Sequence, residues 1–183
     1  MTPKQQLHED GFVIVRGVIS PDELDSIRRS FEGLVDRQRK IWREAAGLDD
    51  PPDGAWATGA QPRLVTYDGL VDDAESARAV EMILGAPLEL SRQIMQAPDV
   101  APTQFMMMCN PTSDHGPAAW HRDIHPIDMA PLGNLQADLM ENGPKYLQWN
   151  IPLYDDDVLW VLPGSHIRPN TEAENRQLST VDH

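Results

Sequence analysis

The sequence predicts an α+β fold whose β part is a barrel or a sandwich. Three observations support this: a capped amphipathic helix near the N-terminus, a second helical segment after a loop, and a series of apolar strand-like segments from residue 88 onward. Helices that precede a run of strands are typical of α+β chains, and short strands separated by turns favour a barrel or sandwich. With 183 residues, the chain has the length of a single domain, since the prior is about 150 residues per domain.

The chain begins with a predicted strand and a long helix. Residues 12–16, Phe-Val-Ile-Val-Arg between two glycines, have the β-branched composition of a strand. Ser20 and Glu23 are spaced as in a capping box, with proline at the first helical position. Apolar residues then recur at helical spacing, so one face of the helix is expected to pack on the body of the protein. We expect this helix to run to about Ala46 and to stop at Gly47.

A loop over residues 49–59 and a second helix over about 74–84 complete the N-terminal part, about residues 1–87. The remainder, about 88–183, is expected to form a partial β core. A helix near 135–140 is expected within it. After residue 171 the chain is polar, with helical character and no closing strand, so we expect the fold to be incomplete at His183. Turns separate the predicted strands, which are 88–95, 103–109, 118–124, 146–153 and 158–162.

Composition excludes several classes of protein. The net charge of −14, from 15 basic and 29 acidic residues, makes nucleic acid an unsuitable partner. No apolar run approaches the roughly 20 residues of a membrane span, and residues 1–10 contain no secretory signal. Cys109 is the single cysteine, which excludes internal disulfides and CxxC zinc sites. We therefore expect a soluble, cytoplasmic protein without a membrane partner.

The chemistry centres on Trp120-His121-Arg122-Asp123. Residues i and i+2 of a strand point to the same face, about 6.6 Å apart along the chain. His121 and Asp123 can therefore bind one metal ion from the same side, and a second histidine from elsewhere would complete a 2-His-1-carboxylate triad. The alternative is a surface histidine beside a solvated aspartate.

The sequence resembles the phytanoyl-CoA dioxygenase family of Fe(II)- and 2-oxoglutarate-dependent oxygenases. The similar blocks fall in the family's order and cover about residues 7–170. They are DGFVIVRGVISPDEL at 10–24, WHRDIHP at 120–126, LQWNIPL at 147–153 and LPGSH at 162–166. The resemblance implies that the β core is a double-stranded β-helix, also called a jelly-roll or cupin-like fold, with iron at its mouth.

The resemblance also implies a set of site residues. His121 and Asp123 match the first two iron ligands, and Trp149 matches a position that lines the 2-oxoglutarate site. Gln104 matches a co-substrate contact in some relatives, and Met106 shares its face. The alternatives are core packing for Trp149 and Met106 and an exposed polar strand residue for Gln104.

By resemblance, the enzyme uses Fe(II), 2-oxoglutarate and O₂ to hydroxylate a small organic molecule. It converts 2-oxoglutarate to succinate and CO₂. The carboxylate of Asp123 favours hydroxylation, because related halogenases carry a small residue there. The sequence indicates neither the identity of the substrate nor an oligomeric state.

The family's distal histidine and the basic residue for 2-oxoglutarate lie beyond the PGSH turn, and no matching positions follow here. Three explanations are open: a longer protein of which these residues are a part, a genuine fragment, or a relative without catalysis. We favour the first. Two other functions are also open. One is a non-catalytic binding module on the same barrel, and the other is a cupin-like enzyme, such as an isomerase, that uses His166 as a third ligand.

Overall fold

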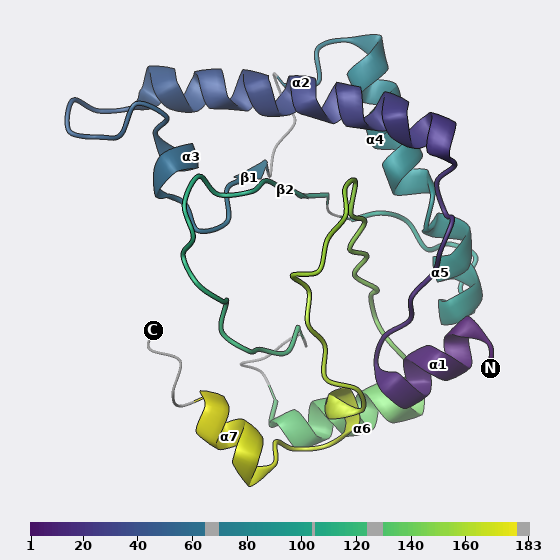
Figure 1. Cartoon of the computed structure of the whole chain (residues 1–183). Coiled ribbons are helices and arrows are strands. Elements are labelled where there is room, and N and C mark those ends of the chain that lie inside the picture. Colours follow the sequence, from purple (N-terminus) through teal and green to yellow (C-terminus); the bar gives the residue numbers. More distant parts are fainter. Residues whose placement is uncertain (65–69, 104, 124–129, 179–183) are drawn as a thin grey trace. The chain divides into compact units, whose positions relative to one another are not determined.

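A computed structural model of the chain describes residues 1–64, 70–103, 105–123 and 130–178 (Figure 1). The chain divides into two compact units. Unit 1 comprises Met1–Arg16, Leu90–Val100 and Pro117–His183, and unit 2 comprises Gly17–Glu89 and Ala101–Gly116. In chain order the elements are α1 (Pro3–Asp10), α2 (Pro21–Ala45), α3 (Ala55–Thr58), β1 (Arg63–Leu64), α4 (Ala74–Gly85), α5 (Leu88–Met95), β2 (Met107–Met108), α6 (Leu132–Asn142), the 3₁₀ helix η1 (Ser165–Ile167) and α7 (Glu172–Leu178).

The longest element of unit 2 is α2, and its start is the predicted capping box. The backbone N–H of Glu23 donates to Ser20 Oγ over 3.3 Å, and the backbone N–H of Ser20 donates to Glu23 Oε2 over 3.2 Å. These bonds satisfy donors that the first turn of a helix leaves free. The predicted helix is therefore confirmed, and it ends at Ala45, one residue before the expected end.

The core of unit 2 lies between α2 and α4, the second predicted helix. Ile27, Phe31 and Leu34 of α2 are buried, as are Ala79 and Ile83 of α4. The ring of Phe31 also meets that of Phe105 edge to face, with centroids 6.0 Å apart. This packing of an apolar helix face against its neighbours supplies the main stabilisation of such a unit.

An arginine of α2 joins the helix to the start of α4. Arg37 donates to the backbone carbonyl of Leu70 and pairs with Asp72 at 2.7 Å and Asp73 at 2.6 Å. Asp73 also caps α4 by accepting the backbone N–H of Ser76 at 2.8 Å. The Ser76 N–H and the Arg37 guanidinium favour the charged carboxylate, so they hold the pKa of Asp73 far below its ordinary value.

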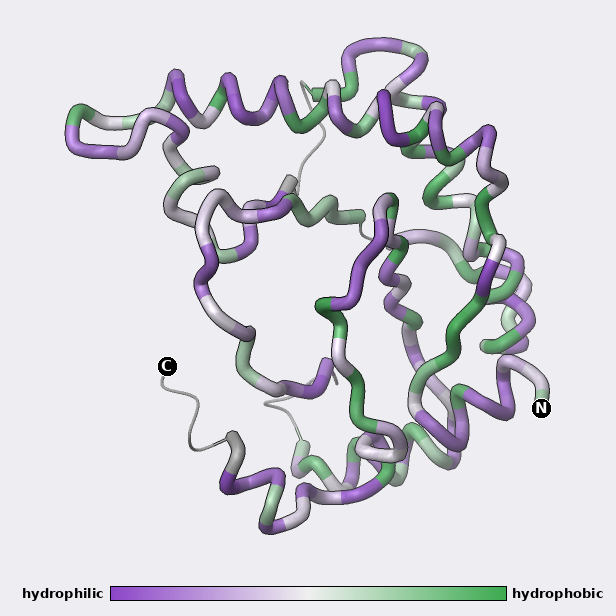
Figure 2. The backbone as a smooth tube through the Cα atoms, in the orientation of Figure 1, coloured by the Kyte–Doolittle hydropathy of each residue, from purple (hydrophilic) through white to green (hydrophobic). Residues whose placement is uncertain are grey.

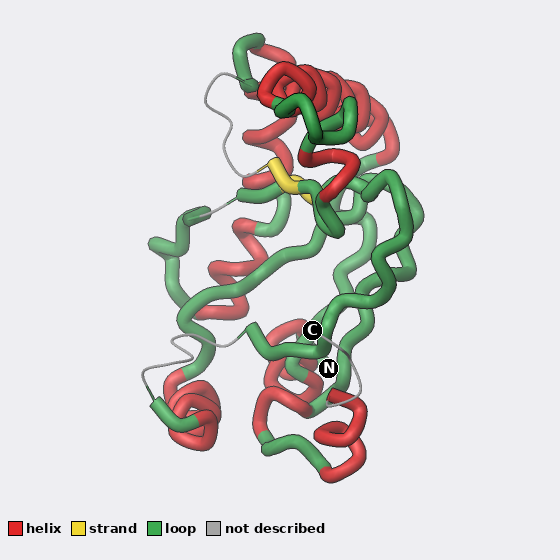
Figure 3. Tube along the Cα trace, turned by 90° about the vertical axis from the view of Figure 1, so that its left-hand side faces the viewer, coloured by secondary structure: helices red, strands yellow, loops and turns green. Residues whose placement is uncertain are grey.

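The predicted β core is not confirmed. Within the described residues, the strands are β1 and β2, an antiparallel pair in which Arg63 faces Met108 and Leu64 faces Met107. In the described part of the predicted strand 103–109, the prediction is confirmed only at β2, and the prediction of an N-terminal strand at 12–16 is wrong. Loops also replace the described parts of the other predicted strands, 118–123, 146–153 and 158–162 (Figure 3). A strand requires a hydrogen-bonded partner, which local composition does not provide.

The prediction of a strand at 88–95 is wrong in a different way, because these residues form the helix α5. Ser91 and Ile94, three residues apart, are its buried positions. Short apolar runs fit a helix and a strand equally well, and here Pro87 directly precedes the helix, where proline is well tolerated.

Unit 1 contains α1, most of α5, α6, η1 and α7. The helix α6 confirms the one expected near 135–140, and α7 confirms helical character after residue 171. The helix α1 was not predicted, although Thr2, Pro3 and Gln5 form a capping box at its start. Its end at Gly11 lies beside the turn before η1, where the backbone N–H of Gly164 donates to the carbonyl of Asp10 over 2.9 Å.

Apolar side chains in unit 1 are partly exposed. In the loop at 158–162, each of the five residues is at least 41% exposed, and most of this segment has the green colour of hydrophobic residues in Figure 2. In the described part of the chain, no helix combines the length and the apolar character needed to cross a membrane.

Candidate functional site

The predicted ligands His121 and Asp123 lie together in unit 1. The segment that carries them is a loop, yet the two side chains share one face, with His121 Nε2 3.4 Å from Asp123 Oδ1. The expected i, i+2 relationship therefore holds without a strand. It depends on the local alternation of an extended chain, which does not require a paired neighbour.

A backbone contact determines which nitrogen of His121 faces the aspartate. His121 Nδ1 lies 2.9 Å from the carbonyl oxygen of Ala119, and since a carbonyl only accepts hydrogen bonds, Nδ1 carries the proton. Nε2 is therefore the nitrogen that faces Asp123. This is the arrangement in which a metal-binding histidine is oriented through its other nitrogen.

The pair fits a metal ion as two of its ligands. Two ligand atoms about 2.1 Å from one ion and at right angles lie about 3.0 Å apart, which is close to the observed 3.4 Å. The side chains are 68% and 50% exposed, so an ion can approach from solvent. Across residues 1–64, 70–103, 105–123 and 130–178, no group of three or more His, Cys, Asp or Glu side chains is arranged to hold an ion.

Two side chains hold the backbone of this segment. Arg122 donates through Nε to the Ser165 carbonyl at 3.2 Å and through Nη2 to the Arg168 carbonyl at 3.4 Å. The hydroxyl of Tyr146 donates to the backbone carbonyl of Asp123. Partial burial, and then the charge of the Asp123 carboxylate, raise the pKa of the Tyr146 hydroxyl, which keeps it a donor.

Sequence reasoning missed both of these supports. Arg122 lies between the two predicted ligands, so alternation alone places it on the opposite face, and this signal was available. Tyr146 is 23 residues from Asp123, and no local pattern connects the two.

The predicted co-substrate residues fall in different parts of the chain, and their roles stay predictions. Trp149 lies in unit 1, half-buried, where its Nε1 donates to Ser91 Oγ at 2.9 Å. Met106 is half-buried in unit 2, and Gln104 lies outside the described residues. The indole of Trp149 is therefore oriented by a buried hydroxyl, while its role toward 2-oxoglutarate stays a prediction.

His166, the histidine of the PGSH turn, packs against the end of α1. Its Nε2 lies 3.0 Å from the carbonyl oxygen of His8, and its ring lies so close to Gly11 that a Cβ there would be 2.5 Å from Nδ1. The Nδ1 atom is buried. These contacts give the imidazole a packing role between two segments of unit 1.

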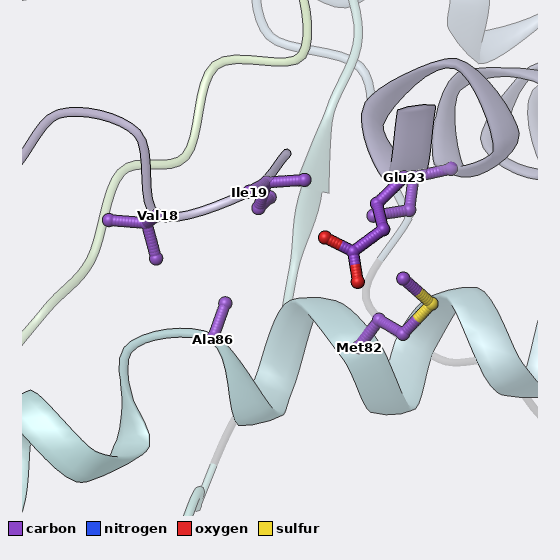
Figure 4. Close-up of a pocket in the computed structure, with 6 residues that line it drawn as sticks. Val18, Ile19, Glu23, Met82 and Ala86 are labelled. Carbon is purple, nitrogen blue, oxygen red and sulfur yellow. The ribbon is translucent and has the colours of Figure 1, made fainter. Parts of the chain in front are cut away.

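A small pocket lies in unit 2 and contains none of the predicted site residues (Figure 4). It measures about 150 Å³ and is lined mainly by apolar side chains, with the Glu23 carboxylate at one side. That carboxylate is already bonded to Ser20 in the capping box, so the pocket offers no free catalytic group. The lining residues are Val18, Ile19, Glu23, Ile27, Met82 and Ala86.

Comparison with known proteins agrees with the sequence motifs. Neither a search of curated proteins nor a search of solved structures found a match to this chain. The sequence model of one family, described as phytanoyl-CoA dioxygenase (PhyH), matches residues 7–180 and so includes the His-x-Asp segment and the PGSH turn. The chain therefore belongs to the phytanoyl-CoA dioxygenase family.

Proposed function

We propose that this protein is an Fe(II)- and 2-oxoglutarate-dependent dioxygenase that hydroxylates a small organic molecule. Members of the family are generally oxygenases that use these cofactors, and the family implies a cupin-like fold. The observation that carries the proposal is the 3.4 Å pair of His121 Nε2 and Asp123 Oδ1, with His121 Nδ1 held by the Ala119 carbonyl.

In this proposal the chain's own residues bind and orient. His121 and Asp123 supply a neutral nitrogen and a carboxylate oxygen to the iron, a combination suited to Fe(II) with open positions. When bound, Fe(II) supplies the oxygen activation that the family couples to decarboxylation of 2-oxoglutarate to succinate and CO₂. Trp149, Gln104 and Met106 are proposed to line the co-substrate site.

The test measures succinate formation from 2-oxoglutarate by the full-length protein with Fe(II) and O₂ and without an added substrate. We expect turnover by the unaltered protein and loss to the background rate in His121→Ala and Asp123→Ala. Matched controls are His115→Ala and Asp155→Ala, which replace the same residue types at exposed positions outside the pair. Succinate formation that persists in His121→Ala or in Asp123→Ala contradicts the proposed ligands.

The two other functions considered from the sequence make different predictions. A non-catalytic binding module shows no Fe(II)-dependent turnover of 2-oxoglutarate even in the full-length protein. A cupin-like isomerase with His166 as a ligand loses its metal in His166→Ala and needs no 2-oxoglutarate. The contacts of His166 with His8 and Gly11 favour a packing role, so we expect His166→Ala to retain the metal and to lower stability instead.

A further inference from the structure

The segment that carries the ligand pair has no strand partner among the described residues, and this raises the question of what holds it. In a sheet, ladder hydrogen bonds fix the backbone from which the side chains project. In this segment, the backbone is held instead by side chains that donate hydrogen bonds to backbone carbonyls. The relevant contacts all lie within unit 1.

The first anchor is Arg122. Its guanidinium has several donors in a rigid plane, so it can hold two carbonyls at once, and it reaches those of Ser165 and Arg168 at 3.2 and 3.4 Å. Because neighbouring residues of an extended chain project in opposite directions, anchoring Arg122 on one side directs His121 and Asp123 to the other.

The acceptor of this anchor is itself fixed. Gln136 of α6 is 6% exposed, and its Nε2 donates to the same Arg168 carbonyl at 2.8 Å. The Arg168 guanidinium pairs with both carboxylate oxygens of Glu174 in α7, at 2.7 and 2.8 Å. The carbonyls that accept from Arg122 therefore belong to a turn that is itself held in place, and their position fixes the backbone of the segment that carries His121 and Asp123.

The second anchor is Tyr146. Its hydroxyl donates to the carbonyl of Asp123, one of the two ligand residues, and so limits rotation of the peptide after the ligand. Together the two anchors hold the segment at consecutive residues and from two different parts of unit 1.

We propose that Arg122 and Tyr146 are positioning residues that set the affinity and the coordination geometry of a metal ion at His121 and Asp123. The inference rests on the proposed function, because it requires that this pair binds the metal. Groups that orient metal ligands typically change affinity by 10–100-fold when removed. Since both anchors act through the backbone and not on the ligand atoms, we expect an effect of about tenfold for each.

The experiment titrates the full-length protein with Co²⁺, a spectroscopic substitute for Fe(II), and follows both the dissociation constant and the visible absorption spectrum. The variants are Arg122→Gln and Tyr146→Phe. The matched control is Arg37→Gln, which removes another arginine that donates to a backbone carbonyl, in unit 2. Unfolding curves of each variant separate loss of structure from loss of metal, and Tyr146→Phe deletes one oxygen, so it provides a second, milder variant.

We expect Arg122→Gln and Tyr146→Phe to weaken Co²⁺ binding about tenfold and to alter its absorption bands. Arg37→Gln should lower stability while leaving the dissociation constant and the spectrum unchanged. If the unaltered protein binds Co²⁺ and both Arg122→Gln and Tyr146→Phe keep its affinity and absorption spectrum, the positioning role alone is overturned. Absence of binding by the unaltered protein contradicts the proposed ligand pair itself, so the two failures are distinguishable.

Discussion

Replacing Gly11 by alanine provides a sharp test of how the N-terminal helix is joined to the PGSH turn. Gly11 ends α1 in the left-handed region, with φ of +83°, and its Cβ position lies 2.5 Å from His166 Nδ1 and 2.8 Å from His166 Cγ. Two costs therefore add in Gly11→Ala: backbone strain and displacement of the imidazole.

The magnitude follows from these two terms. A non-glycine residue in the left-handed region costs roughly 1–2 kcal/mol. If the ring moves, its 3.0 Å contact with the His8 carbonyl is lost, which costs about 1 kcal/mol. We expect Gly11→Ala to lower the free energy of unfolding by about 2–3 kcal/mol, measured by urea denaturation followed by tryptophan fluorescence.

The control is Gly164→Ala in the same unit. Gly164 has φ of +71°, and a Cβ there meets nothing within 4 Å, so this variant carries the strain without the clash. We expect Gly11→Ala to cost about 1 kcal/mol more than Gly164→Ala, and this difference should vanish in the His166→Ala background. Equal costs for the two glycines, or strict additivity of Gly11→Ala and His166→Ala, refute the contact as the source of the effect.

Three further predictions concern stability and reactivity. Leu34 is 0% exposed, so Leu34→Ala should lower the free energy of unfolding by about 2–5 kcal/mol. Leu48→Ala, at an exposed position, should lower it by less than about 0.5 kcal/mol. Similar losses for the two variants in urea denaturation contradict the core of unit 2. The hydrogen bond from Arg168, followed by the Thr171 N–H, lowers the pKa of Glu174 from 4.5 to about 2, so stability present above pH 4.5 is lost as the pH falls toward 2. Acid titration of Glu174→Gln should show a weaker loss over that range, and an unchanged titration contradicts the pairing. Burial raises the pKa of the Cys109 thiol from 9.0 to about 11, so iodoacetamide at pH 8 should react about 100-fold more slowly with the folded protein than in urea. Equal rates contradict the burial of this thiol.

Helices with strong end signals were predictable from the sequence. The capping box of Ser20 and Glu23 operates over three residues, and the apolar spacing that follows selects the face that packs. The same kind of signal is present at α1, where Thr2 and Gln5 form a capping box. Local signals of this kind need no information from the rest of the chain.

Strands were not predictable in the same way. The apolar residues of Leu88–Met95 fit both periods, and the helix was selected by burial of Ser91 and Ile94. In the loop at 158–162 the composition is that of a strand, yet the structure shows no ladder there. Pairing depends on a second segment at the right distance, which is a property of the whole fold.

For the candidate site, the family and the pair of His121 and Asp123 could be identified before folding is considered, because motif order and i, i+2 alternation are properties of the chain's linear order. The groups that hold this pair depend on the folded chain. The carbonyls that receive Arg122 lie 43 and 46 residues away, and Ser91 lies 58 residues from Trp149. Hydrogen bonds at such separations form only after the chain has folded, since no local preference brings these groups together.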